Sequence, residues 1–329
     1  MRQSLKRIWA VARLTSMEGL RQPAFFFIFI IAAGLTALSP CFAFFHLGEE
    51  AKMVIDLGLS TILTFSTLLA LLIASSTVTD EIEGRTALTM LSKPLRREEF
   101  LLGKFCGVTY SAASLALLMA PVLLTTLRSQ QYESQQDPLF AIATLSSITL
   151  GLILYGIFLV IRLIFGRGPT LVPAFWMAYI AAAAFLLIFM AIVSKAGATW
   201  NWRILIGLFF ICLHTWVISA VAVTLASRFT LVQSAIGTAA FFMVGHTASA
   251  LVAPFRTNDQ NLNLVGNVLR AILPDLDQFN ITDTLAMGYM DKPIPIPFDI
   301  IAGSTIYALL YGLALLALAA ALFSKRELG

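Results

Sequence analysis

The densest group of ionisable side chains in this sequence is a 25-residue stretch from Asp80 to Lys104. It holds 10 of the 40 charged residues of the 329-residue chain. Uncharged runs long enough to cross a membrane, 57–79 and 105–127, lie on either side of it. Such a polar segment must lie in water, because hydrocarbon offers its polar groups no partners. Pro94 divides the stretch into two parts.

The first part, residues 80–91, has the pattern of a helix with two apolar stripes. One stripe follows the helical spacing i, i+3, i+4, i+7 and consists of Gly84, Ala87, Leu88 and Leu91. The second, on roughly the opposite side, consists of Ile82, Thr86 and Met90. Glu81 and Arg85 have the spacing and order of a favourable i, i+4 ion pair. Such a helix can rest one stripe on lipid or protein and offer the other to a partner; the alternative is a positive loop that only sets topology.

Two histidines, His214 and His246, lie within apolar runs. They could face each other as a ligand pair for a metal or haem, although a hydrogen-bonded place in a helix interface is the commoner use of such a residue. The cysteines also lie in or at the edge of apolar runs and have no metal-ligand spacing: Cys41, Cys106 and Cys212. We therefore expect buried, inert thiols, and a disulfide framework is excluded.

Several kinds of chemistry are missing from the sequence. Gly103 and Lys104 are not part of a phosphate-binding loop, because position 98 is Glu where that motif requires Gly. Serine–histidine–aspartate and paired-carboxylate arrangements are also missing, which disfavours an integral-membrane enzyme. The apolar runs contain essentially no ionisable residue besides the two histidines, whereas ion-coupled transporters generally need such residues at membrane depth. Any active transport would therefore draw its energy from a partner.

The composition indicates an all-α polytopic membrane protein. Hydrophobic residues make up 59% of the chain and charged residues 12%, against roughly 25% charged in a soluble domain. The mean hydropathy is +0.86. The net charge of +4 is therefore not interpreted as nucleic-acid binding, because a basic excess in such proteins gathers at the cytoplasmic side.

Eight apolar runs of 22 to 24 residues meet the length of about 20 residues that a membrane-spanning helix needs. They are 24–45, 57–79, 105–127, 139–161, 171–193, 204–226, 231–253 and 300–323. Six spans is the alternative, if 171–193 and 231–253 form a re-entrant or interfacial hairpin. Residues 1–23 interleave basic and apolar side chains, which suits an amphipathic elbow helix in the headgroup region, and no removable signal peptide is evident.

The distribution of Lys and Arg orients these spans. With a cytoplasmic N-terminus the inner segments hold 15 basic residues and the outer segments hold 7. We therefore expect both termini, the 80–104 loop and the 324–329 tail to be cytoplasmic, and the 254–299 loop to be outside. Within that outer loop the sequence predicts a surface helix over 264–273, whose apolar stripe is Val265, Val268, Leu269 and Ile272.

Several ordered motifs resemble the membrane subunits of type-2 ATP-binding-cassette (ABC) exporters. In the charged stretch the matching residues are Glu81, Glu83, Gly84, Thr86, Leu91, Ser92, Pro94, Arg97, Gly103 and Lys104. The segment from Leu273 to Asn280 is similar to the Pro-x-Leu-x-x-Phe-Asn signature before the last span of these permeases. The basic ending from Phe323 to Leu328 and the entry into the first span at Pro23 are also similar.

The resemblance implies a permease of the inner (plasma) membrane that binds no cofactor itself and is not an enzyme. It implies partners: a separate cytoplasmic ABC ATPase that hydrolyses ATP, a second permease copy or homologue, and membrane lipid. The 80–91 segment would be the coupling helix. Its expected ATPase-coupling residues are Glu81, Ile82, Glu83, Gly84, Arg85, Thr86 and Met90. An apolar lining would suit a lipophilic or amphipathic export substrate; the rival hypothesis is a permease-fold assembly or anchoring subunit that moves no solute.

Overall fold

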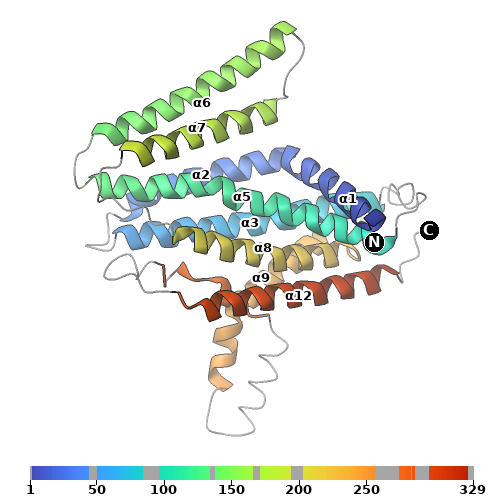
Figure 1. Ribbon diagram of the computed structural model, residues 1–329. Helices are drawn as coiled ribbons and strands as arrows, with labels where there is room; N and C mark the ends of the chain where they lie inside the picture. The colour runs from blue at the N-terminus through green and yellow to red at the C-terminus, as the bar shows by residue number, and fades with distance from the viewer. Residues whose placement is uncertain are drawn as a thin grey trace.

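The computed structural model describes residues 2–43, 50–83, 96–133, 138–165, 171–193, 203–255, 274–282, 284–285 and 296–324. Within these residues the chain is helical and contains no strand. The long helices, in chain order, are α1 (Arg2–Arg21), α2 (Pro23–Ala43), α3 (Glu50–Glu83), α5 (Arg97–Glu133), α6 (Pro138–Phe165), α7 (Leu171–Val193), α8 (Ile204–Ala226), α9 (Leu231–Val252) and α12 (Phe298–Ser324). Two short 3-10 helices, η1 (Ala253–Phe255) and η2 (Asp277–Phe279), complete this part of the chain (Figure 1).

The prediction of an all-α polytopic membrane protein is confirmed. In the described residues six helices are long and apolar enough to cross a membrane: α2, α3, α5, α8, α9 and α12. The predicted run 231–253 is therefore one of the six. The runs 139–161 and 171–193 form the helices α6 and α7, whose described apolar parts, Thr149–Phe158 and Pro173–Leu186, are shorter. A total of eight spans remains a prediction.

Two of the spanning helices are longer than the apolar runs that predicted them. The run 57–79 lies inside α3, which continues through Glu83. The run 105–127 lies inside α5, which already begins at Arg97. Asp80–Glu83, the start of the predicted coupling helix, are thus the last turn of a spanning helix. Residues 84–95 lie outside the described residues, as do the predicted surface helix 264–273 and residues 325–329 of the tail.

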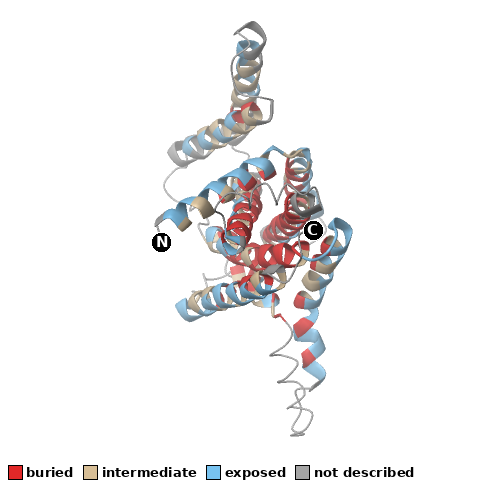
Figure 2. Cartoon of the chain, turned by 90° about the vertical axis from the view of Figure 1, so that its right-hand side faces the viewer, coloured by how far each residue is buried: buried red, intermediate tan, exposed pale blue. Residues whose placement is uncertain are grey.

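The core of the bundle is formed by α3, α5 and α8, which contact one another, with α2 and α12 packed against them. Most residues of α8 are buried on every side of the helix, because it lies in the middle of the bundle. Figure 2 shows the buried residues gathered on these inner helices. In contrast, α6 and α7 lie together at one edge, beside α2 (Figure 1). The start of α1 and the end of α12 lie at the same end of the bundle.

The cysteine prediction is wrong in one respect. All three thiols are free, but Cys41 and Cys106 are exposed on the helices and Cys212 is only partly buried. The reason is physical: in a membrane protein apolar residues face lipid as well as the protein core, so an apolar run does not indicate which of its residues are inside.

Candidate functional site

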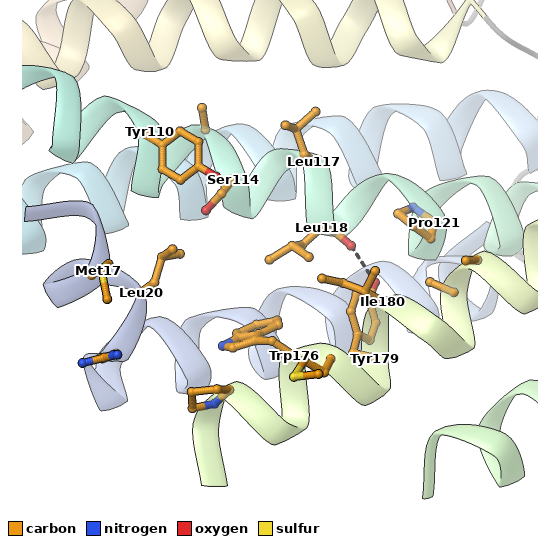
Figure 3. Close-up of a pocket in the computed structure, with 16 residues that line it drawn as sticks. Met17, Leu20, Tyr110, Ser114, Leu117, Leu118, Pro121, Trp176, Tyr179 and Ile180 are labelled. Carbon is orange, nitrogen blue, oxygen red and sulfur yellow. Dashed lines mark hydrogen bonds between the residues drawn. The ribbon is translucent and has the colours of Figure 1, made fainter. Parts of the chain in front are cut away.

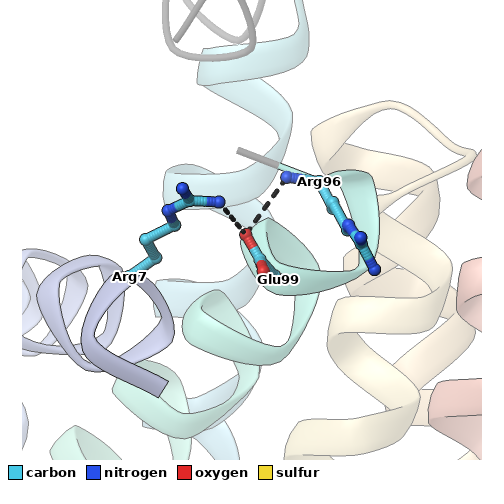
Figure 4. Close-up of polar contacts among 3 residues, drawn as sticks. All are labelled: Arg7, Arg96 and Glu99. Atoms are coloured by element: carbon cyan, nitrogen blue, oxygen red, sulfur yellow. Dashed lines mark hydrogen bonds and ion pairs between the residues drawn. The ribbon is translucent and has the colours of Figure 1, made fainter. Parts of the chain in front are cut away.

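The predicted coupling loop is flanked by a compact polar junction at the start of α5. Glu99, buried in the first turn of α5, accepts a hydrogen bond at Oε2 from the backbone N–H of Arg96, at 3.2 Å. The same oxygen lies 3.6 Å from Nη1 of Arg7 in α1 (Figure 4). The spacing is that of half a capping box, and a carboxylate in the first turn also interacts favourably with the helix dipole. Glu99 thus fixes the start of α5 and joins it to the elbow helix α1.

Lys104 connects the two helices that flank the loop. Its side chain is only 1% exposed, and Nζ donates a hydrogen bond to the backbone carbonyl of Thr77 in α3 at 3.2 Å. The ammonium group also lies 5.8 Å from the centre of the Phe100 ring, within the range of a cation–π interaction. The end of α3 and the start of α5 are therefore held together at the base of the segment 84–95.

The third helix of the junction, α1, approaches α5 at two glycines. A Cβ atom on Gly107 would lie 2.5 Å from Cβ of Thr15, and one on Gly103 would lie 2.6 Å from Cβ of Val11. Distances this short exclude any larger residue without movement of α1. Ser111 of α5 adds a hydrogen bond from its hydroxyl to the carbonyl of Ser16, at 3.3 Å. Gly103 and Lys104, which the sequence indicated only as motif matches, are therefore structural members of this junction.

The predicted coupling residues divide into two groups. Glu81, Ile82 and Glu83 form the last turn of α3, at the end of the bundle where the junction lies; the structure does not describe their side chains. The other four, Gly84, Arg85, Thr86 and Met90, lie outside the described residues. The stripe of Ile82, Thr86 and Met90 therefore stays a prediction.

The sequence interpretation assigned no roles to Glu99, Arg7 and Thr77. A signal for Glu99 was present, because a glutamate three residues after a helix cap is a recognisable start of a helix. The acceptor on Thr77 is a backbone carbonyl, so no side-chain pattern could have identified it.

A second polar site lies deeper in the bundle. Nε2 of the buried His214 in α8 lies 3.3 Å from Nε2 of His246 in α9, and Nδ1 of His214 lies 3.5 Å from the hydroxyl of Thr67 in α3. The two facing nitrogens bond when one carries a hydrogen and the other accepts it. The pair thus joins α8 to α9. Among the described residues no group of three or more His, Cys, Asp or Glu is placed to hold a metal, and structural zinc sites use four protein ligands.

Residues 274–280, the described part of the Leu273–Asn280 motif, pack beside these histidines. The backbone N–H of Leu276 donates to the carbonyl of Gly245 in α9 at 3.2 Å, and the backbone N–H of Asp275 donates to the hydroxyl of Tyr307 in α12 at 3.1 Å. The buried Phe279 ring lies 6.2 Å from the ring of His214. This segment therefore connects α8, α9 and α12, next to a small cavity of about 190 Å³ that His246 and Phe279 line.

A larger, mostly apolar groove of about 710 Å³ lies between α1, α5 and α7 (Figure 3). Its α7 wall is held by a hydrogen bond from the Tyr179 hydroxyl to the carbonyl of Leu118. Trp176 of α7 also packs edge-to-face on two rings of α2, with centroids 5.2 Å from Phe25 and 4.9 Å from Phe29.

No family model matches the sequence. A similar protein is the "Probable ABC transporter permease protein NosY" of Pseudomonas aeruginosa, which is 29% identical over 125 residues. The alignment covers 34% of this chain and 46% of that relative, so the chain spans about half the length of the protein it matches. Together with the apolar helices, this similarity supports a permease-like membrane protein.

Proposed function

We propose that this chain is the membrane-spanning permease subunit of a type-2 ABC exporter, driven by a separate ATPase subunit. The observation that carries the proposal is the junction of Glu99, Lys104 and Arg7, which ties α1, α3 and α5 together at the base of the segment 84–95. A loop that only set topology would need no buried lysine and no buried carboxylate at its base, because both are costly to desolvate.

The junction also offers a route for mechanical coupling. Force from an ATPase on the 80–91 segment would reach α3 and α5 together, since the Lys104–Thr77 hydrogen bond joins them at that end. Both helices contact α8 in the centre of the bundle. The expected consequence is a rigid-body movement of packed helices, one of the common forms of conformational switching. The similarity to an ABC transporter permease is consistent with this role.

The remaining features of the proposal follow from the resemblance of the motifs. The ATPase would hydrolyse ATP, a second permease copy or homologue would complete the transmembrane unit, and the complex would lie in the inner membrane with both termini cytoplasmic. A lipophilic or amphipathic substrate suits the apolar character of the spans and the absence of charged residues in the apolar runs.

Co-expression of the full chain with an ABC ATPase of the same genome tests the proposal, and an ATPase gene adjacent to that of the chain would be the first candidate. The permease function predicts that the ATPase co-purifies with the full chain in detergent. It also predicts that ATP turnover changes when the complex is reconstituted in lipid. Failure of the ATPase to co-purify would contradict the proposal. Co-purification with turnover that is independent of the chain would favour the anchoring role instead.

A further inference from the structure

The groove between α1, α5 and α7 has the shape and chemistry of a site for one lipid tail. Its walls are almost entirely apolar or aromatic, and among the described residues that line it Arg21 is the only charged one. Figure 3 shows α5 along one side of the groove and α7 along the other, with Met17 and Leu20 of α1 at one end. A groove with this lining is unfavourable for water and for ions.

The length of the groove along α5 is close to the thickness of the acyl chains of one leaflet. Its α5 wall runs from Tyr110 to Pro121. With a rise of 1.5 Å per residue this is roughly 16 Å. The hydrocarbon core of a bilayer is about 30 Å thick, so the acyl chains of one leaflet cover about 15 Å.

The groove is open to the side. Tyr110 is 63% exposed, Leu117 61% and Ile180 54%, so large apolar side chains of both walls face the surroundings of the bundle. The walls themselves are anchored: α7 through the Tyr179–Leu118 hydrogen bond and α1 through the Ser111–Ser16 hydrogen bond. An acyl chain can therefore enter laterally from the bilayer without rearrangement of either wall.

Arg21 lines the groove next to Leu20, on the side that α1 forms. It is the last residue of α1, and the apolar helix α2 begins two residues later at Pro23. The connection is fixed by a hydrogen bond from the Gln22 side chain to the hydroxyl of Ser76, at 3.1 Å. The guanidinium group is exposed and has no salt bridge to a carboxylate among the described residues. A guanidinium group at the end of the groove is suited to a phosphate, which it can bind with two hydrogen bonds.

We propose that this groove binds a single anionic phospholipid, with one acyl chain along α5 and the headgroup phosphate at Arg21. The site lies beside the coupling junction and shares none of its lining residues with it, although the Ser111–Ser16 hydrogen bond supports both. The inference stands whether or not the chain is a transporter subunit. The lipid would fill the space between the elbow helix and α7, and its affinity would depend on both the charge at Arg21 and the free volume of the groove.

Native mass spectrometry of the purified full chain in detergent tests the charge requirement. The probes are phosphatidylglycerol and phosphatidylcholine with identical acyl chains. We expect the wild-type chain to retain phosphatidylglycerol more tightly, by about fivefold, since one basic residue near a membrane surface contributes about 1 kcal/mol. Arg21→Gln should remove this preference. The matched control is Arg13→Gln, which neutralises an exposed arginine of α1 outside the groove. This variant should keep the preference for phosphatidylglycerol.

A second pair of variants tests the groove itself. Met177→Trp places a larger side chain at an exposed position that lines the groove and should reduce retention of both lipids. Ile188→Trp introduces the same side chain at an exposed position of α7 outside the groove and should leave the retention of both lipids unchanged. An unchanged preference in Arg21→Gln, or full retention in Met177→Trp, would overturn the proposal. Displacement of phosphatidylglycerol by inorganic phosphate alone would also overturn it, because the site would then bind phosphate without an acyl chain.

Discussion

Lys104 lies inside the bundle, and its ammonium group donates to a backbone carbonyl of the neighbouring helix. The carbonyl of Thr77 and the Phe100 ring together partly replace the water that this cation has lost. The place of Lys104 in the sequence, after Gly103 and at the start of an apolar run, does not predict this hydrogen bond, because its acceptor is a backbone atom 27 residues earlier. Sequence motifs can identify such a lysine, but only the packing of α3 on α5 gives it a role.

Replacement of this lysine should destabilise the protein. Lys104→Ala removes the hydrogen bond to Thr77 and the contact with Phe100, so we expect the free energy of unfolding to fall by about 1–3 kcal/mol. Lys6→Ala, at an exposed position of α1, is the control and should change it by less than about 0.5 kcal/mol. Thermal unfolding of both variants in the same detergent checks this. Equal stability of the two variants would show that the buried lysine is not part of a stabilising junction.

The two histidines give a second prediction at this scale. Because Nε2 of His214 lies 3.3 Å from Nε2 of His246, single replacement of His246 by Leu leaves this buried nitrogen without its partner, while Nδ1 keeps its contact with Thr67. We expect that variant to lose about 1–3 kcal/mol of stability. Replacement of both histidines by Leu should cost less than the sum of the two single changes. A double-mutant cycle by thermal unfolding measures the coupling, and additive effects would mean that the pair contributes no interaction energy.

At the scale of the helices, each apolar run identified from the sequence lies within or along a long helix of the structure. These runs did not predict where the helices end or which residues face outward. The predicted span 57–79 ends close to the apolar part of α3, which ends at Val78, but the helix itself continues through Glu83, because helix hydrogen bonds do not stop where a membrane does. Cys41 and Cys106 were expected to be buried but are exposed, because a lipid-facing and a core-facing residue have the same hydropathy. Contacts such as Arg7–Glu99 depend on how helices cross and cannot be derived from a pattern within one helix.

The close approach of α1 to α5 makes a prediction about glycine. In Gly107→Ala the new Cβ would lie 2.5 Å from Cβ of Thr15 and 2.8 Å from the carbonyl oxygen of Ala12, so α1 must shift. We expect a loss of about 1–3 kcal/mol from overpacking. Gly34→Ala is the matched control, because no atom lies within 4 Å of its new Cβ and alanine favours the helix by about 1 kcal/mol. The melting temperatures of the two variants should therefore move in opposite directions; a shift in the same direction would contradict the packing of α1 on α5.

At the scale of the whole molecule, the start of α1, the base of the predicted coupling loop and the end of α12 share one end of the bundle (Figure 1). This arrangement agrees with a chain that crosses the membrane an even number of times. The side on which this end lies is predicted from the 15 inner and 7 outer basic residues.

Labelling with a membrane-impermeant thiol reagent tests that orientation. In a cysteine-free background of the full chain, Lys93→Cys should not be labelled in intact cells and should be labelled once the membrane is permeabilised. The reason is that a basic loop is expected on the cytoplasmic side. Asn267→Cys in the predicted outer loop is the counterpart and should be labelled in intact cells. Strong labelling of Lys93→Cys in intact cells would reverse the topology and place the coupling loop out of reach of a cytoplasmic ATPase.

The proposed transport role depends on the 80–91 segment as the contact for the ATPase. Its direct test is co-purification of the ATPase with the double variant Ile82→Asp and Met90→Asp, with the membrane level of the chain measured in parallel. We expect a normally inserted chain that no longer retains the ATPase, because an unpaired charge buried in an interface costs several kcal/mol. Glu81, Glu83 and Arg85 are expected to form ion pairs at the exposed edge of this contact, so Glu81→Ala should have a milder effect that depends on the salt concentration. Retention of the ATPase by the double variant at the wild-type level would contradict this role and leave this segment as a topological anchor.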